Sequence, residues 1–379
     1  MVKTDEALTR GVADILPSKK GLADLMAKKK ITLYQGFDPS MSKLHIGNWI
    51  GIRKLAQFQQ LGHKVIFLVG DFTGTIGDPT DKSAARKKLT RQQVLENAKD
   101  YKKQIAKTLK FTGPNAAEIR FNSEWLNKLN FEEVIELSSH FTVQQLLERD
   151  FFQQRLKKEK PIYLHEFLYP LMQGYDCVMM DVDLEIGGND QLFNMMAGRM
   201  LMKALKGKEK YVLTMKILED PTGKKMGKTE GNTINLTDLP INIFGKIMAL
   251  PDSLINPGVE LLTDLSLDLT DKLKPLESKK ALAFDVVKQL HGEVKAKEAQ
   301  KEFEKTFQKR APEYKTEIAA KPTLLATVAE VIGSVSQAKR LIKQGAVDIN
   351  GATVSDPTHQ IKGGEKIKIG KKTFVKVKK

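Results

Sequence analysis

The chain of 379 residues has 62 Lys and Arg against 46 Asp and Glu, a formal net charge of +16. Its 41% hydrophobic and 28% charged content argues against wholesale disorder. No apolar run approaches the roughly eighteen residues of a transmembrane helix, and no signal or transit peptide is predicted. The one cysteine, Cys177, excludes an intramolecular disulfide and a multi-cysteine zinc site, so a cytoplasmic compartment is expected.

Basic residues gather near the C-terminus. From Lys321 to Lys379 the sequence has twelve Lys and Arg against four Asp and Glu, so these 59 residues carry +8, half of the net charge. A lysine-rich proteome explains the total charge equally well. The uneven distribution, however, favours a C-terminal module that binds a polyanion such as RNA.

Strands and helices alternate through the first 217 residues. The pattern predicts strands at 31–36, 64–69, 118–121, 183–186 and 211–217, and helices at 45–61, 91–109, 163–180 and 190–205. This order predicts an α/β fold with a mostly parallel sheet of Rossmann type. Ligands of such sheets bind beyond the carboxyl ends of the strands.

The remainder of the chain has a different character. From 232 to 321 the pattern is helical with several prolines, and Lys321-Pro322 is a natural boundary. Two short helices at 323–332 and 336–344 then precede glycine-punctuated short strands. We therefore predict a Rossmann-like catalytic domain at 1–230, an α-helical domain and linker at 231–321, and a small α+β domain at 322–379.

The usual nucleotide-binding signatures fail. No Gly-x-Gly-x-x-Gly follows the first predicted strand, which argues against a dinucleotide dehydrogenase. The segments 77–83 and 223–229 each approach a P-loop, but both break the fixed spacing that lets successive backbone amides wrap a phosphate.

Two other segments could bind phosphates. Asp38-Pro-Ser-Met-Ser-Lys-Leu-His-Ile-Gly-Asn48 joins a strand to a helix, and His45 and Asn48 share a face at the N-terminus of that helix, which suits the phosphates of ATP. Lys224-Lys-Met-Gly-Lys-Thr229 is a basic loop whose lysines would neutralise a departing pyrophosphate. Taken singly, the first motif is better explained as a capping histidine and the second as a solvated turn.

Together, these segments resemble the two signatures of class I aminoacyl-tRNA synthetases. His45-Ile-Gly-Asn48 is similar to HIGH, and Lys225-Met-Gly-Lys-Thr229 is similar to KMSKS. Four further blocks narrow the resemblance to the bacterial-type tyrosyl-tRNA synthetases over nearly the whole chain: Tyr34-x-Gly-Phe-Asp-Pro, 70–79, Tyr169-Pro-Leu-Met-Gln-Gly-Tyr-Asp176 and Gly187-Gly-Asn-Asp-Gln191.

The resemblance implies roles for the matching residues. Tyr34 and Asp176 are expected to bind the phenolic hydroxyl of tyrosine, and a carboxylate that only accepts hydrogen bonds suits a phenol O–H. The remaining tyrosine-binding residues implied are Asp78, Tyr169 and Gln173 at the ammonium group and Thr73 and Gln191 near the adenylate. The implied ATP-binding residues are Ser40, His45, Gly47, Asn48, Gly188, Asp190 and Lys228. The implied catalytic residues are His45, Asn48, Lys225, Lys228, Thr229, Lys82 and Arg86.

Three positions depart from the family pattern. Asn48 replaces the second histidine of HIGH, which keeps a donor without a chargeable ring. Gly227 replaces the serine of KMSKS, and Asn189 stands where the family usually has Thr or Ser. We expect these departures to affect the motion of the loops that carry them and the rate of catalysis.

The C-terminal segment resembles the small RNA-binding module named after ribosomal protein S-four. The matching run extends from Ser336 to Gly351 and is followed by Asp356-Pro and Gly363-Gly-Glu-Lys. Lys339, Arg340 and Lys343 would lie on one side of a helix and contact RNA phosphates. An exposed basic helix without a partner is the alternative.

The resemblance implies an enzyme that activates L-tyrosine with ATP and transfers it to tRNA-Tyr. It also implies Mg²⁺ bound with ATP rather than in a protein metal site, a homodimer, and no membrane association. Two alternatives remain. A tryptophanyl-tRNA synthetase is disfavoured by the Tyr34 and Asp176 pair and by the basic C-terminal module. A non-catalytic RNA-binding protein with a synthetase fold is disfavoured by the intact His45, Lys225 and Lys228.

Overall fold

The computed structural model describes residues 3–78, 89–219, 233–308, 314, 316–370 and 373–378. Contacts divide the chain into two compact units, Met1–Ala296 and Lys297–Lys379. The first unit contains a six-stranded sheet in the order β1-β6-β5-β2-β3-β4. Its strands are β1 (Val12–Leu16), β2 (Thr32–Phe37), β3 (Lys64–Val69), β4 (Glu118–Phe121), β5 (Leu184–Gly188) and β6 (Tyr211–Met215).

All neighbouring strands of this sheet run parallel except β1, which pairs antiparallel with β6. The mostly parallel sheet predicted from the sequence is therefore confirmed. Tyr34 on β2 is paired in register with Glu185 on β5 and with Ile66 on β3. These three residues therefore lie next to one another across three adjacent strands. The apolar run of β3 is buried along its length, as expected for a central parallel strand.

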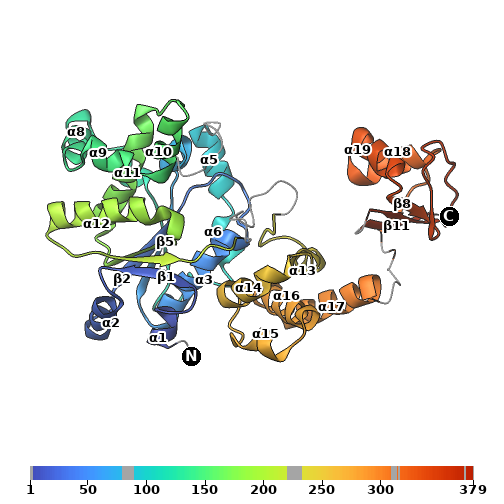
Figure 1. Cartoon of the computed structure of the whole chain (residues 1–379), viewed down its shortest axis with the longest axis horizontal. Helices are drawn as coiled ribbons and strands as arrows, with labels where there is room; N and C mark the ends of the chain where they lie inside the picture. The colour runs from blue at the N-terminus through green and yellow to red at the C-terminus, as the bar shows by residue number, and fades with distance from the viewer. Residues whose placement is uncertain are drawn as a thin grey trace. The chain divides into compact units, whose positions relative to one another are not determined.

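Helices cover both faces of the sheet. α3 (Ile46–Gln60) joins β2 to β3, whereas α12 (Leu192–Lys206) joins β5 to β6 in the opposite direction along the sheet. Right-handed crossovers therefore place α3 and α12 on opposite faces. Figure 1 shows α12 together with α11 (Leu164–Met180) on one side of the strands. The apolar layer between these helices and the sheet includes Tyr34, Leu68 and Cys177.

Shorter helices complete this part of the first unit. They are α1 (Thr4–Ala7), α2 (Lys19–Lys28), α4 (Thr73–Ile76), α5 (Arg91–Ala98), α6 (Tyr101–Ile105), α7 (Ser123–Leu126), α8 (Phe131–Ser139), α9 (Val143–Leu147), α10 (Asp150–Lys157) and the 3-10 turn η1 (Asn189–Gln191). The predicted strands at 64–69 and 118–121 have the observed bounds. The predicted helix at 91–109 is instead two helices, α5 and α6, and the predicted helix at 190–205 begins as η1.

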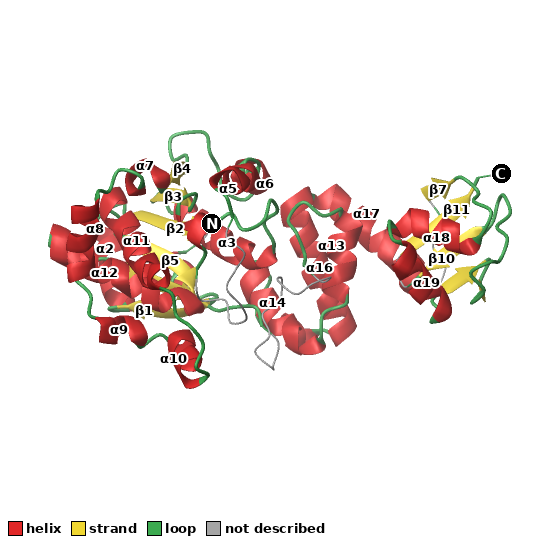
Figure 2. Cartoon of the chain, turned by 90° about the horizontal axis from the view of Figure 1, so that it is seen from above, coloured by secondary structure: helices red, strands yellow, loops and turns green. Residues whose placement is uncertain are grey.

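A second group of helices follows β6 along the chain. It comprises α13 (Pro240–Met248), η2 (Asp252–Leu254), α14 (Ile255–Leu262), α15 (Leu269–Lys272), α16 (Pro275–His291) and α17 (Glu293–Phe303), which continues as the π-helical turn η3 (Glu304–Gln308). Figure 2 shows α13, α14 and α16 gathered beside α3. The helical character predicted for this stretch is confirmed, and prolines begin both α13 and α16.

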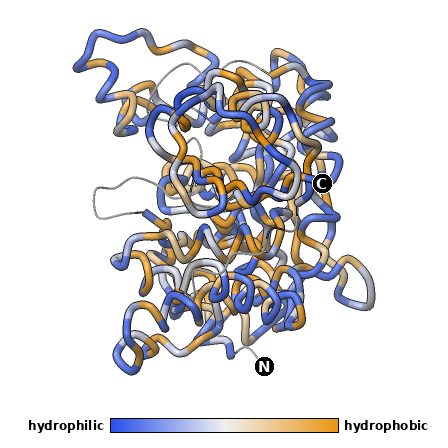
Figure 3. Tube along the Cα trace, turned by 90° about the vertical axis from the view of Figure 1, so that its right-hand side faces the viewer, coloured by the Kyte–Doolittle hydropathy of each residue, from blue (hydrophilic) through white to orange (hydrophobic). Residues whose placement is uncertain are grey.

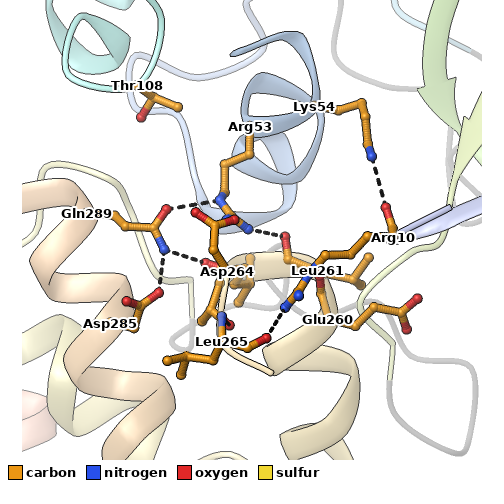
Figure 4. Close-up of polar contacts among 12 residues, drawn as sticks. Arg10, Arg53, Lys54, Thr108, Glu260, Leu261, Asp264, Leu265, Asp285 and Gln289 are labelled. Atoms are coloured by element: carbon orange, nitrogen blue, oxygen red, sulfur yellow. Dashed lines mark hydrogen bonds and ion pairs between the residues drawn. The ribbon is translucent and has the colours of Figure 1, made fainter. Parts of the chain in front are cut away.

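Two buried or half-buried arginines cap the C-terminus of α14 (Figure 4). Arg10 donates to the carbonyl oxygens of Val259 and Glu260, at 2.8 and 3.1 Å. Arg53, on α3, donates to the Leu261 carbonyl at 3.0 Å and forms an ion pair with Asp264. The last carbonyls of a helix lack partners within the helix, and cations suit its negative end. These contacts fix α14 to α3.

Lys54, next to Arg53 on α3, is buried with 2% of its surface exposed. Its ammonium donates to the backbone carbonyls of Ala7 and Arg10, at 2.8 and 2.9 Å. Burial, together with the nearby positive charge of Arg53, lowers the pKa of Lys54 to about 7.

The second unit has its own sheet, in the order β7-β11-β10-β8-β9. Its elements are β7 (Thr316–Ile318), α18 (Leu324–Ile332), α19 (Val335–Lys343), β8 (Val347–Ile349), β9 (Ala352–Thr353), β10 (Lys366–Ile369) and β11 (Thr373–Val377). A separate apolar core between helices and sheet includes Leu324, Ile342 and Ile367. β7 lies before residue 322, where the sequence predicts the C-terminal domain to begin. The sheet of the second unit therefore starts earlier in the chain than predicted.

Hydrophobic and hydrophilic residues are interspersed along the trace (Figure 3). In the part of the chain that the structure describes, every helix is too short or too polar to cross a membrane.

We predict that Lys54 makes stability rise with pH. An unfolded lysine titrates near 10.5 and folded Lys54 at about 7. Between these values the unfolded chain holds a proton that the folded chain has released, so the free energy of unfolding should increase by at most about 1.4 kcal/mol per pH unit. Denaturant unfolding of the wild type and Lys54→Met at pH 7.5 and 9 tests this. A stability difference between the two proteins that does not change with pH would contradict it.

Candidate functional site

A cavity of about 290 Å³ opens at the carboxyl ends of β2 and β5 and at the N-terminus of α3. It lies where parallel sheets usually bind ligands. Thirteen of the predicted site residues line it, from five separate stretches of sequence: Tyr34, Ser40, His45, Gly47, Asn48, Thr73, Asp78, Tyr169, Gln173, Asp176, Gly188, Asp190 and Gln191. The other small-molecule site residues predicted, Lys82, Arg86, Lys225, Lys228 and Thr229, lie outside the described residues.

His45 and Asn48 form a capping box at the start of α3. The Gly47 amide donates to Nδ1 of His45 at 3.1 Å, and the His45 amide donates to Oδ1 of Asn48 at 3.1 Å. Because Nδ1 is an acceptor here, a neutral His45 carries its proton on Nε2. The amide group of Asn48 likewise keeps its N–H donors. The capping interpretation is thus correct, and capping also presents donors at the helix N-terminus.

The stretch 220–232 is flanked on both sides by residues near the pocket. Lys216, Ile217 and Leu218 line the pocket before it. After it, the carbonyl of Ile234 accepts from the Ile46 amide at 3.0 Å, next to His45. The described residues on either side of this stretch therefore lie close to the pocket and to the start of α3.

Asp176 lies at the inner end of the pocket with 2% of its surface exposed. Its carboxylate accepts from Nε1 of Trp125 at 2.7 Å and from Nδ2 of Asn122 at 3.3 Å. Burial raises the pKa of Asp176 well above its usual range, and these two hydrogen bonds act in the opposite direction. A carboxylate has about four acceptor positions, so Asp176 can accept a further O–H donor from a ligand.

Tyr34, on β2, is buried, and its hydroxyl lies 3.1 Å from Sγ of Cys177. Cys177 is buried as well, and its thiol is 3.4 Å from the Glu185 carboxylate. Desolvation by burial raises the pKa of both the Tyr34 hydroxyl and the Cys177 thiol. Cys177 is thus part of a chain of polar contacts that runs from Tyr34 to Glu185.

Asp38 connects two of the predicted residues. Its carboxylate accepts from the Tyr169 hydroxyl at 2.8 Å and from the Thr73 hydroxyl at 2.7 Å. Gly70 makes this possible, because a Cβ there would lie 2.1 Å from Oδ1 of Asp38. Burial, together with the charge of Asp38, raises the pKa of Tyr169 and keeps this phenol protonated.

The wall of the pocket contains further acceptors. Asp78 accepts from Gln191 and lies 3.6 Å from Nη2 of Arg149, which is 5% exposed. Nε2 of Gln173 donates to Oε1 of Glu185 at 2.9 Å. The pocket thus combines an acceptor-rich inner end with donors at the N-terminus of α3, which suits a ligand with both cationic and anionic groups.

The sequence reasoning missed several residues that position this site: Asp38, Asn122, Trp125, Arg149, Glu185 and Lys210. Asn122 and Trp125 follow directly after β4, so their place beyond the carboxyl end of a parallel strand could have identified them. Glu185 is a charged residue inside a predicted buried strand, which is itself a signal. Arg149 gave no signal in the sequence.

The predicted RNA-binding residues lie together on the second unit. Lys339, Arg340 and Lys343 are exposed on α19, whose opposite face buries Ala338 and Ile342 in the core. Three adjacent cations on one exposed face suit contact with a phosphate backbone. Among the described side chains, no group of three His, Cys, Asp or Glu residues has an arrangement that could hold a metal ion.

α11 and α12 pack closely through two glycines. A Cβ at Gly174 would lie 2.9 Å from Leu201. A Cβ at Gly198 would lie 2.6 Å from Sγ of Cys177 and 3.0 Å from Nζ of Lys210. The glycines thus leave room for the polar groups behind the pocket.

Comparison with known proteins identifies two matching families. The model described as tRNA synthetases class I (W and Y) matches residues 26–308, and the S4 domain model matches residues 328–367. The tyrosine–tRNA ligase of Carboxydothermus hydrogenoformans is 40% identical over 98% of this chain and 97% of its own length. The tyrosine–tRNA ligase of Desulfotalea psychrophila is 42% identical over 98% and 97%.

Solved structures support the fold. A C-terminally truncated mitochondrial tyrosyl-tRNA synthetase from Aspergillus nidulans has a TM-score of 0.68 at 22% identity, covering 80% of this chain and 93% of its own. The tyrosyl-tRNA synthetase of Archaeoglobus fulgidus complexed with L-tyrosine has a TM-score of 0.60 at 22% identity, covering 78% and 99%.

We predict opposite effects for two helix glycines replaced by alanine. Gly198→Ala should lower the free energy of unfolding by about 1–3 kcal/mol, because its Cβ displaces the Cys177 and Lys210 side chains. Gly245→Ala, in α13, is the matched control. Its Cβ meets nothing within 4 Å, so greater helix propensity should stabilise the protein by about 0.5–1 kcal/mol. Denaturant unfolding measures both, and equal shifts would refute the close packing at Gly198.

Proposed function

Because this chain belongs to the class I tyrosine–tRNA ligases, we propose specific roles for its pocket residues in the activation of tyrosine. The chain activates L-tyrosine with ATP and transfers it to tRNA. The observation that carries the residue roles is the convergence of thirteen predicted residues on one cavity.

The phenol of tyrosine binds at the inner end, between Tyr34 and Asp176. Trp125 and Asn122 anchor Asp176. Its carboxylate accepts a hydrogen bond from the phenolic hydroxyl of tyrosine. Phenylalanine would leave this buried carboxyl group without that partner, which costs free energy. Selection for tyrosine follows from one buried acceptor.

The ammonium group binds the acceptors on the wall, Asp78, Tyr169 and Gln173, with Thr73 and Gln191 close to the adenylate. ATP lies toward the N-terminus of α3, where Ser40, His45, Gly47 and Asn48 face its phosphates. Gly188 and Asp190 contact its ribose. The donors at the helix N-terminus stabilise the negative charge that develops on the phosphates.

The reaction has two steps. A carboxylate oxygen of tyrosine attacks the α-phosphorus of ATP, and pyrophosphate leaves with the bonding electrons. A ribose hydroxyl at the 3′ end of the tRNA then attacks the tyrosyl carbonyl, and AMP leaves. Lys82, Arg86, Lys225, Lys228 and Thr229 are proposed to neutralise the pyrophosphate, with Mg²⁺ bound to ATP. Catalysis rests on positioning and charge stabilisation.

We propose that residues 1–230 carry out catalysis, that the helical segment 231–321 contacts tRNA, and that residues 322–379 bind RNA. A homodimer in the cytoplasm completes the proposal. The dimer is supported by large exposed apolar side chains on or next to α8 to α11, which are typical of an interaction surface: Phe131, Ile135, Val143, Leu156, Tyr163 and Leu164.

We predict that ATP–pyrophosphate exchange with each of the twenty amino acids is rapid with tyrosine alone. Asp176→Ala should reduce exchange with tyrosine and narrow its preference over phenylalanine, because the buried phenol acceptor is lost. Lys54→Gln, further along α3 and outside the pocket lining, serves as a control that keeps the preference. Equal exchange with tryptophan would indicate a tryptophanyl enzyme, and exchange with no amino acid a non-catalytic protein.

We further predict that the triple variant Lys339→Gln, Arg340→Gln and Lys343→Gln binds tRNA at least tenfold more weakly. The slope of its log Kd against the logarithm of the salt concentration should be smaller by roughly 2, because three phosphate contacts no longer release counterions. Pyrophosphate exchange should not change.

The matched control replaces three exposed lysines of the first unit, Lys28, Lys203 and Lys206, by glutamine. It removes the same charge. If both triple variants lose the same affinity and the same salt dependence, net charge rather than α19 governs tRNA binding.

A further inference from the structure

The pocket wall includes one member of a buried charged pair that the proposed chemistry does not use: Glu185 lines the pocket, and its partner Lys210 lies outside the lining. Glu185, on β5, is 1% exposed, and Lys210, just before β6, is fully buried. The Lys210 ammonium forms an ion pair with Oε2 of Glu185 and donates to the Met195 carbonyl at 2.9 Å. Burying two charges costs more than a surface pair, so an apolar pair of similar size would often be as stable. The pair therefore calls for a role other than stability.

The contacts of Glu185 indicate that role. Its Oε1 accepts from Nε2 of Gln173 at 2.9 Å, and its Oε2 lies 3.4 Å from the Cys177 thiol. An amide presents donors at one end and an acceptor at the other. With its nitrogen held by Glu185, Gln173 keeps its oxygen for the pocket that it lines.

Lys210 keeps Glu185 an acceptor. The other titratable groups beside Glu185 are Tyr34, Cys177 and Asp176, and none of these three supplies a cation. The positive charge of Lys210 offsets the cost of burying the negative charge of Glu185, and any change that made residue 185 donate to Gln173 would reverse the amide of Gln173. Gly198 provides the space, because a Cβ there would lie 3.0 Å from Nζ of Lys210.

We propose that Glu185 and Lys210 are positioning residues that lock the amide of Gln173 with its oxygen toward the substrate ammonium group. This inference rests on the proposed contact between Gln173 and that ammonium group. It makes the affinity for the amino group of tyrosine depend on an ion pair that does not touch the substrate.

The test compares tyrosine with 3-(4-hydroxyphenyl)propionate, which lacks the amino group. In Glu185→Gln, the new amide oxygen binds Lys210, so its NH₂ faces Gln173 and turns the Gln173 oxygen away from the pocket. Tyrosine binding measured by calorimetry should weaken tenfold or more, because the ammonium then meets donors. Binding of the propionate should stay within about twofold, which also shows that the pocket is folded.

Lys210→Met is the second variant. It should also lower the ratio of the affinity for tyrosine to the affinity for the propionate. Asp183→Asn is the matched control: Asp183, just before β5, is also buried and is paired with Lys29 and Lys208, at 2.8 and 3.1 Å. It should leave the ratio unchanged. A ratio that falls equally in the control would overturn the inference, because general loss of a buried ion pair would explain it.

Gln173→Ala separates this inference from the proposed function. If Gln173→Ala lowers the ratio but neither Glu185→Gln nor Lys210→Met does, the ammonium contact stands and the locking role is wrong. If Gln173→Ala leaves the ratio unchanged, the ammonium contact itself is wrong and the inference fails with it.

Discussion

A carboxylate can be buried at the end of a parallel sheet only where donors surround it, and this requirement arranges most of the pocket. Asp176 is held by Trp125 and Asn122, and Glu185 by Lys210 and Gln173. These donors come from three parts of the chain, the start of α7, α11 and the residue before β6, so satisfying the two carboxylates fixes these parts relative to one another. The cost of leaving such a group unpaired is large. In the proposed function, Asp176 then meets the substrate directly, whereas Glu185 acts on it through Gln173.

A second constraint joins the pocket to the helical part of the first unit. α3 presents His45 at its first turn and carries Arg53 two turns later, where Arg53 caps α14. A helix is stiff over this distance, so movement of α14 would be transmitted to the donors at the N-terminus of α3. The contact between Asp264 and Arg53 is partly exposed and that with the Leu261 carbonyl is buried, so the backbone contact contributes more to this connection.

The sequence predicted the parallel sheet because its apolar runs are long and bounded by turn residues, and it predicted the pocket lining through short motifs at strand ends. It did not predict β1, whose residues alternate weakly and which pairs antiparallel at the sheet edge. It also missed Glu185 and Lys210, because their contacts with each other and with Gln173 form only when β5, α11 and the start of β6 come together. A pattern along one segment cannot reveal a hydrogen bond between segments that are 25 residues apart. The roles of the thirteen lining residues remain predictions until the variants are measured.

The geometry of the capping box explains how the chain tolerates asparagine at position 48. The residue at this position accepts a hydrogen bond from the His45 amide, and the proposed function also asks it to offer a donor to the pocket. Asparagine does both at once, because its oxygen and nitrogen are separate groups on one planar amide. A neutral histidine also has one acceptor and one donor nitrogen. The exchange therefore preserves the hydrogen-bonding pattern and removes only the capacity to titrate, so the donor at residue 48 becomes independent of pH.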